Sequence, residues 1–105
     1  MKENIVKELR KGFRVEADRF NVLMADYELY QDIPINSFTI LEIRQKFQYL
    51  RGAINSYETE TDGSTYANSN LTNAIHLGKQ LHKKLNKLEK IIKKMEEQAN
   101  GEFTR

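Results

Sequence analysis

The chain has no cysteine and no tryptophan, and it has only one proline among its 105 residues. Without cysteine it can form neither a disulfide nor a thiolate metal site, and this composition fits a reducing compartment. No window approaches the roughly 18 uninterrupted apolar residues that a transmembrane helix needs. The first residues, MKENIVKELRKGF, carry charges every few positions, so we expect no signal peptide. We therefore expect a cytoplasmic protein that does not associate with membranes.

Catalytic and metal-binding motifs are also missing from the sequence. It contains no glycine-rich phosphate loop and no serine in a nucleophile-elbow setting. His76 and His82 are six positions apart, whereas a zinc-binding pair on a helix needs a spacing of four. The acidic residues Glu58, Glu60 and Asp62 are not followed by the bidentate glutamate that closes a calcium loop. The sequence predicts neither enzymatic activity nor a cofactor or metal.

Three segments of the chain repeat apolar residues at spacings of three and four, which indicates amphipathic helices. The first predicted helix covers residues 2–31 and ends before Pro34, because the residue preceding a proline avoids the helical conformation. The second covers residues 37–57, with Asn36 or Ser37 as its N-cap, and the third covers residues 70–99, with Asn70 as its N-cap. A polar loop is expected over 58–69, and a frayed tail over 100–105 after Gly101. Alternatively, the second half of that loop is already helical, with Tyr66 and Ala67 extending the third helix backwards.

The apolar residues of each predicted helix fall on the a and d positions of a heptad. Only Glu16 interrupts the first series, and it would need a partner such as Arg44 or Arg51, or a register-fixing role. The sequence predicts a single all-α domain over residues 1–105. It is a three-helix antiparallel bundle with coiled-coil-like heptad packing, two long helices and one shorter middle helix. The three series are Val6, Leu9, Phe13, Phe20, Leu23, Tyr27 and Tyr30; Ile40, Ile43, Phe47, Leu50, Ile54 and Tyr57; and Leu71, Ala74, Gly78, Leu81, Leu85, Leu88, Ile92, Met95 and Ala99.

The short middle helix cannot cover the whole apolar face of its two neighbours. The uncovered surface favours contact with a second copy or with another protein; alternatively, the long helices fray or bend at Gly12 and Gly78. Three aromatic residues, Phe38, Tyr49 and Tyr66, fall outside the heptad series. Because aromatic residues are enriched at protein interfaces, these three are candidate interface residues.

Lysines accumulate in the last predicted helix, although the net charge of the chain is only +2. Those on its outer face are candidate contacts for a polyanion or an acidic partner: Lys79, Lys83, Lys87, Lys90 and Lys94. A simpler interpretation is a solvated helix face, with the cations favoured near the helix C-terminus or beside the acidic second half of the first helix. The series lacks the arginines and aromatic residues that commonly bind nucleic acids.

We interpret the chain as a small non-catalytic helical regulator or adaptor that acts by protein–protein contact, with homo-oligomers expected. The alternative is a nucleic-acid-binding accessory protein that uses the lysine face of the third helix. A short, lysine- and asparagine-rich, all-helical chain is similar to many accessory proteins of phages and mobile elements. That resemblance implies a role of the same kind.

Overall fold

A computed structural model of the chain contains three α-helices. Helix α1 spans Lys2–Leu29, α2 spans Ser37–Thr59 and α3 spans Thr65–Phe103. The structure describes residues 2–29, 37–59 and 65–103, and the side chains of residues 2–29, 39–59 and 69–98. These described residues are helical throughout, without a strand, and each helix contacts the other two. The fold is therefore an all-helical bundle of three helices, as the sequence predicts.

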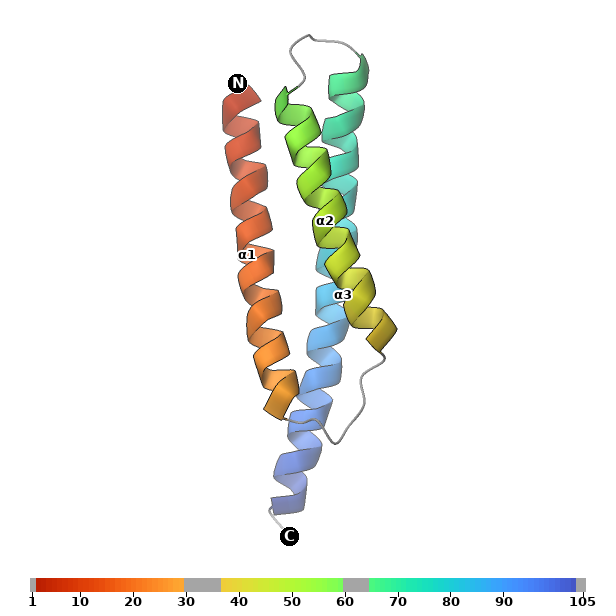
Figure 1. Cartoon of the computed structure of the whole chain (residues 1–105). Helices are drawn as coiled ribbons and strands as arrows, with labels where there is room; N and C mark the ends of the chain where they lie inside the picture. The colour runs from red at the N-terminus through yellow and green to blue at the C-terminus, as the bar shows by residue number, and fades with distance from the viewer. Residues whose placement is uncertain (1, 30–36, 60–64, 104–105) are drawn as a thin grey trace.

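The three helices lie side by side, with their axes in similar directions (Figure 1). The chain runs down α1 from the N-terminus, back up α2, and down α3 (Figure 1). The polar contacts between α2 and α3 agree with these directions. Glu42 of α2 pairs with Lys84 of α3, whereas Lys46, four positions later in α2, bonds to Gln80, four positions earlier in α3. The molecule measures 64 × 23 × 16 Å, and α3 extends beyond the lower ends of the other two helices (Figure 1).

The core lies along the faces that carry the predicted apolar series. Ile43, Leu81, Leu85 and Leu88 have no exposed surface, and burying each such side chain contributes roughly 1.5–3 kcal/mol. The helices α2 and α3 share the most extensive interface, whereas α1 packs less extensively on both. The buried residues are Val6, Phe20, Leu23, Ile43, Leu50, Ala53, Ile54, Tyr57, Ala74, Leu77, Leu81, Leu85, Leu88, Ile92 and Met95.

Helix α1 begins at Lys2 and α2 begins at Ser37, as predicted, but three other helix ends differ from the predicted ones. Helix α2 continues to Thr59 and α3 begins at Thr65, so the loop predicted over 58–69 is too long at both ends. The alternative, in which Tyr66 and Ala67 extend the third helix backwards, is confirmed. No glycine or proline lies between residues 65 and 77, and the polar residues there each lower helix propensity by less than about 1 kcal/mol. Helix α3 also continues through Gly101 to Phe103, because a single glycine costs a helix only about 1 kcal/mol. The predicted end at 99 and the tail over 100–105 were therefore placed too early.

Some predicted features lie outside the described parts of the chain. Residues 30 and 31, the predicted end of the first helix, are among them, as are residues 60–64 of the predicted loop. The side chains of Phe38, Tyr66 and Ala99 are also outside the described set.

Candidate functional site

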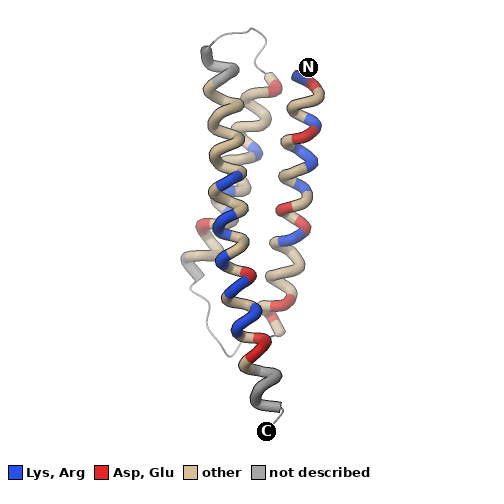
Figure 2. The backbone as a smooth tube through the Cα atoms, turned by 180° about the vertical axis from the view of Figure 1, so that it is seen from behind, with Lys and Arg blue, Asp and Glu red and all other residues tan. Residues whose placement is uncertain are grey.

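The five outward lysines of α3 form one exposed surface, which we call the lysine surface: Lys79, Lys83, Lys87, Lys90 and Lys94. Seen from behind the view of Figure 1, basic residues follow one another along α3 (Figure 2). Lys94 lies fifteen positions after Lys79, so the surface extends over about 22 Å of helix. Among the described residues, none of the five forms an ion pair with an acidic side chain. Their positive charge therefore remains available to a partner.

Two other lysines of α3 are engaged in ion pairs. The Lys84 ammonium lies 2.7 Å from the Glu42 carboxylate of α2, and this hydrogen bond and charge lower the pKa of Glu42 from its ordinary value. Lys93 lies 3.3 Å from Glu89 on its own helix. These two pairs engage Lys84 and Lys93 and leave the lysine surface uncompensated.

The sequence also suggested that the lysines of α3 lie beside acidic residues of α1. Within the described ranges, no ion pair joins an α3 lysine to Asp18, Asp26 or Glu28. One arginine of α1 pairs with the opposite polarity, with the base on α1 and the acid on α3: the Arg19 guanidinium lies 2.6 Å from the Glu89 carboxylate.

Tyr49 of α2 lies beside the lysine surface. Its side chain is 60% exposed, and it lines a groove of about 560 Å³ between α2 and α3 together with Lys46, Lys83 and Lys87. Residues 69–98, the part of α3 whose side chains the structure describes, include no phenylalanine or tyrosine, but the neighbouring helix supplies this one. Of the three candidate aromatics, Tyr49 is the one whose side chain the structure describes, and it is exposed as an interface residue must be.

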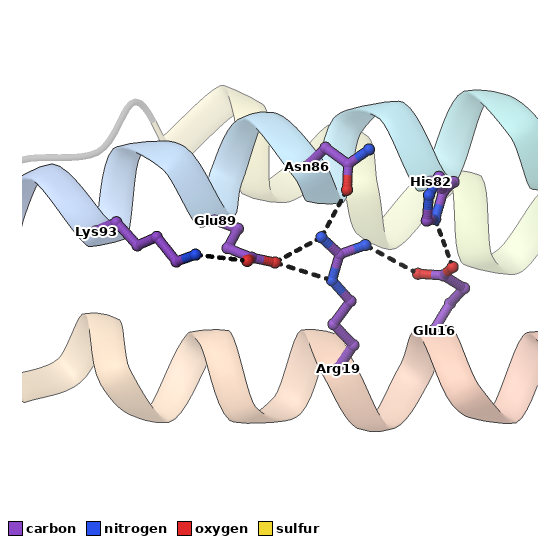
Figure 3. Close-up of polar contacts among 6 residues, drawn as sticks. All are labelled: Glu16, Arg19, His82, Asn86, Glu89 and Lys93. Atoms are coloured by element: carbon purple, nitrogen blue, oxygen red, sulfur yellow. Dashed lines mark hydrogen bonds and ion pairs between the residues drawn. The ribbon is translucent and has the colours of Figure 1, made fainter.

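A polar network joins α1 to α3 halfway along the bundle (Figure 3). Glu16 Oε1 lies 2.7 Å from Nδ1 of His82, and its other oxygen lies 3.6 Å from the Arg19 guanidinium. The expectation that Glu16 pairs with Arg44 or Arg51 is therefore wrong. Those arginines are on α2, whereas Glu16 lies on the side of α1 that faces α3.

Arg19 is the centre of this network (Figure 3). Its Nη2 atom donates to Glu89 Oε2 and to Asn86 Oδ1, both at 2.6 Å, and its Nε atom donates to Glu89 Oε2 at 3.2 Å. The hydrogen bond from Arg19, followed by that from Lys93, lowers the pKa of Glu89 from its ordinary value. Because these charged groups bond to one another across two helices, their arrangement is that of a structural clasp.

An apolar groove of about 580 Å³ lies between α1 and α3. It extends from the clasp towards the N-terminal end of α1. Leu9, Phe13, Leu50 and Ala74 are among its lining residues, and so are the two glycines that lie inside these helices, Gly12 and Gly78. A Cβ atom built on either glycine would meet nothing within 4 Å. The groove is therefore open beside both glycines.

The outer face of α1 carries a second apolar feature that sequence reasoning missed. Val15, Val22 and Leu29 are 59%, 61% and 75% exposed, and each follows the previous one by seven positions. Seven residues are almost two full helical turns, so the three side chains lie on one face; we call them the outer α1 stripe. Their spacing of seven positions is visible in the sequence, but it is less conspicuous than the longer core series of the same helix.

Comparison of the chain with protein-family models, curated proteins and solved structures finds no match. Among the described helices, none is long and apolar enough to cross a membrane. In the same residues, histidines and carboxylates do not gather into a group of three that could hold a metal ion.

Proposed function

We propose that this protein is a small non-catalytic regulator or adaptor that acts by contact with other proteins, including a second copy of itself. The proposal includes a cytoplasmic location, an accessory role of the kind found in phages and mobile elements, and antiparallel helices packed in the manner of a coiled coil. The main support is the outer α1 stripe, because three large apolar side chains in a row on a helix surface are a common feature of contact sites.

The exposure of the stripe sets the strength of the expected self-association. Each of its three side chains is more than half exposed, so covering one contributes about 1 kcal/mol. A symmetrical pair of copies covers two stripes and gains about 6 kcal/mol, against at least about 4 kcal/mol of lost translational and rotational freedom. The small surplus predicts an association that depends on protein concentration, and not a permanent dimer.

Static light scattering over a range of protein concentrations tests the proposal. The wild-type mass should rise above the 12.3 kDa of one chain as the concentration increases. Replacing Val15, Val22 and Leu29 with glutamine should return it to that of one chain. A matched control replaces Leu41 and Ile91, which are 50% and 39% exposed on other helices, and should associate like wild type. A wild-type mass of one chain at every concentration would refute the self-association.

A second function, binding of nucleic acid by the lysine surface, is favoured by one observation. Tyr49 places an exposed aromatic ring beside Lys83 and Lys87, and a ring next to cations can stack on a base while they contact phosphates. Fluorescence anisotropy with a labelled single-stranded oligonucleotide would then show binding that weakens steeply with salt. Replacing Lys83, Lys87, Lys90 and Lys94 together with glutamate should abolish it and leave the helix content unchanged. Unaltered binding by that variant would exclude this function.

A further inference from the structure

A second groove, between α1 and α2, is lined by arginines and phenylalanines. It has two adjoining parts of about 360 and 320 Å³, which share Phe13, Ala17 and Arg51. Arg10 and Arg14 line the first part, and Arg44 lines the second. We call this feature the arginine groove. Of the five arginines that the described ranges contain, four lie here and one, Arg19, lies in the clasp.

Three of these guanidinium groups have no acidic partner. Arg10 is the exception, since it lies 2.6 Å from Glu58. In the described part of the chain, Arg14, Arg44 and Arg51 form no ion pair. Arg44 lies 5.3 Å from the ring centre of Phe20, and Arg51 lies 5.5 Å from that of Phe13. Stacking on a ring fixes the plane of a guanidinium and leaves its N–H groups free to bond to an anion.

The charge of this groove distinguishes it from the others. No aspartate or glutamate is among the described residues that line either of its parts. By contrast, Glu8 and Glu16 line the apolar groove between α1 and α3, and Glu42 lines the groove beside Tyr49. A concave site whose charged lining residues are all cations attracts an anionic ligand.

We propose that the arginine groove binds a segment of a partner protein that combines aspartate or glutamate with large apolar side chains. This proposal rests on the adaptor function and names the chemistry of the partner. Carboxylates accept two parallel hydrogen bonds from a guanidinium, and apolar side chains can pack on the exposed parts of Phe13 and Phe47, which are half-buried and line the same groove.

The ring geometry favours a protein segment over a nucleic acid strand in this groove. Phe47 lies 5.4 Å from Phe13 at an interplanar angle of 80°, and 5.6 Å from Phe20. The three rings thus pack on one another, and guanidinium groups cover two of them, which leaves little ring surface for stacking on bases. Arginine and phenylalanine are also the residues enriched at protein interfaces, where lysine is depleted.

Selection from a phage-displayed library of random dodecapeptides on the immobilised protein tests this inference. The selected peptides should be enriched in aspartate and glutamate next to leucine or phenylalanine. The Arg44→Gln, Arg51→Gln double variant should bind them at least about tenfold more weakly, because the charge-assisted hydrogen bonds are lost. The Arg44→Lys, Arg51→Lys variant keeps the charge but not the planar fork, and it should show an intermediate affinity.

A matched control removes the same charge from the lysine surface. The Lys83→Gln, Lys87→Gln variant should bind the selected peptides within about twofold of wild type, since long-range charge effects are screened by salt. Circular dichroism of each variant verifies that the helices are retained. An absence of enrichment, a pool that is not acidic, or equal loss of affinity in the control would overturn the inference, as would oligonucleotide binding that requires Arg44 and Arg51.

Failure of this inference can be distinguished from failure of the adaptor function. The arginine groove and the outer α1 stripe share no residue, so the Arg44→Gln, Arg51→Gln variant should keep the wild-type mass in light scattering. If peptides fail but the concentration-dependent mass persists, only the arginine groove is wrong. If peptides bind and the mass stays at one chain, only the self-association is wrong.

Discussion

Replacing the two glycines that face the groove between α1 and α3 should stabilise the protein. Gly12 and Gly78 lie in continuous helix, neither has a positive φ, and an added Cβ would meet nothing within 4 Å at either position. An alanine in a helix interior is favoured over glycine by about 0.8–1 kcal/mol. Since the new methyl groups meet no clash, the Gly12→Ala, Gly78→Ala variant should gain about 2 kcal/mol in free energy of unfolding.

For a domain of about this size, each kcal/mol raises Tm by about 4–8 °C. The double variant should therefore melt about 8–16 °C above wild type, measured by circular dichroism at low protein concentration, with urea unfolding to give the free energy. The mirror-image control is Ala25→Gly at an exposed position of α1, which should lose about 1 kcal/mol. A double variant that melts at or below the wild-type temperature would refute the reasoning. It would mean that the helices are interrupted at these glycines, or that the groove is filled in solution.

Three further results are expected. Leu85 has no exposed surface, so Leu85→Ala should lower the free energy of unfolding in urea by about 2–5 kcal/mol. Leu41 is 50% exposed, so Leu41→Ala should lower it much less. Equal losses would contradict the assigned core. The pKa values of Glu42 and Glu89 are lowered in the folded protein, so their stabilising effect is present at pH values above the ordinary 4.5 of a glutamate and is lost as the pH falls through the lowered values. The Glu89→Gln variant should accordingly melt below wild type at pH 7 and approach it at low pH, and a Tm difference that does not change with pH would exclude this linkage. Arg19→Gln should lower Tm more than Arg14→Gln. Arg19 bonds to Glu89 and Asn86 across helices, whereas Arg14 is exposed and makes no ion pair in the described part of the chain. A larger loss of Tm for Arg14→Gln would show that the clasp does not hold α1.

Local pattern was sufficient to predict the helical class and most of the core. Leu81, Leu85 and Leu88 repeat at helical spacing, and that spacing alone brings them to one face of α3, where the structure buries them completely. The helix ends were less predictable because capping and propensity terms are each about 1 kcal/mol or less. Such small terms allowed α3 to continue through Gly101.

The contacts between helices could not be predicted from the sequence. Tyr49 is thirty-four positions away from Lys83, and their proximity depends on how α2 rotates against α3. The partners of Glu16 depend in the same way on which flank of α1 faces α3, and this is why arginines of α2 were expected in place of His82. As a result, Arg44 and Arg51 form no ion pair within the described ranges, and they line the arginine groove together with Arg10 and Arg14.

The most direct test of the central claim, that a second protein chain covers the outer face of α1, uses the absence of cysteine from the sequence. An Ala25→Cys variant carries one thiol on that face, and a Gln45→Cys variant carries one on exposed α2. The rate constant for reaction with a maleimide is measured at increasing protein concentration. We predict that it falls for Ala25→Cys, as the thiol becomes covered, and stays constant for Gln45→Cys. Rate constants that are independent of concentration in both variants would contradict the account.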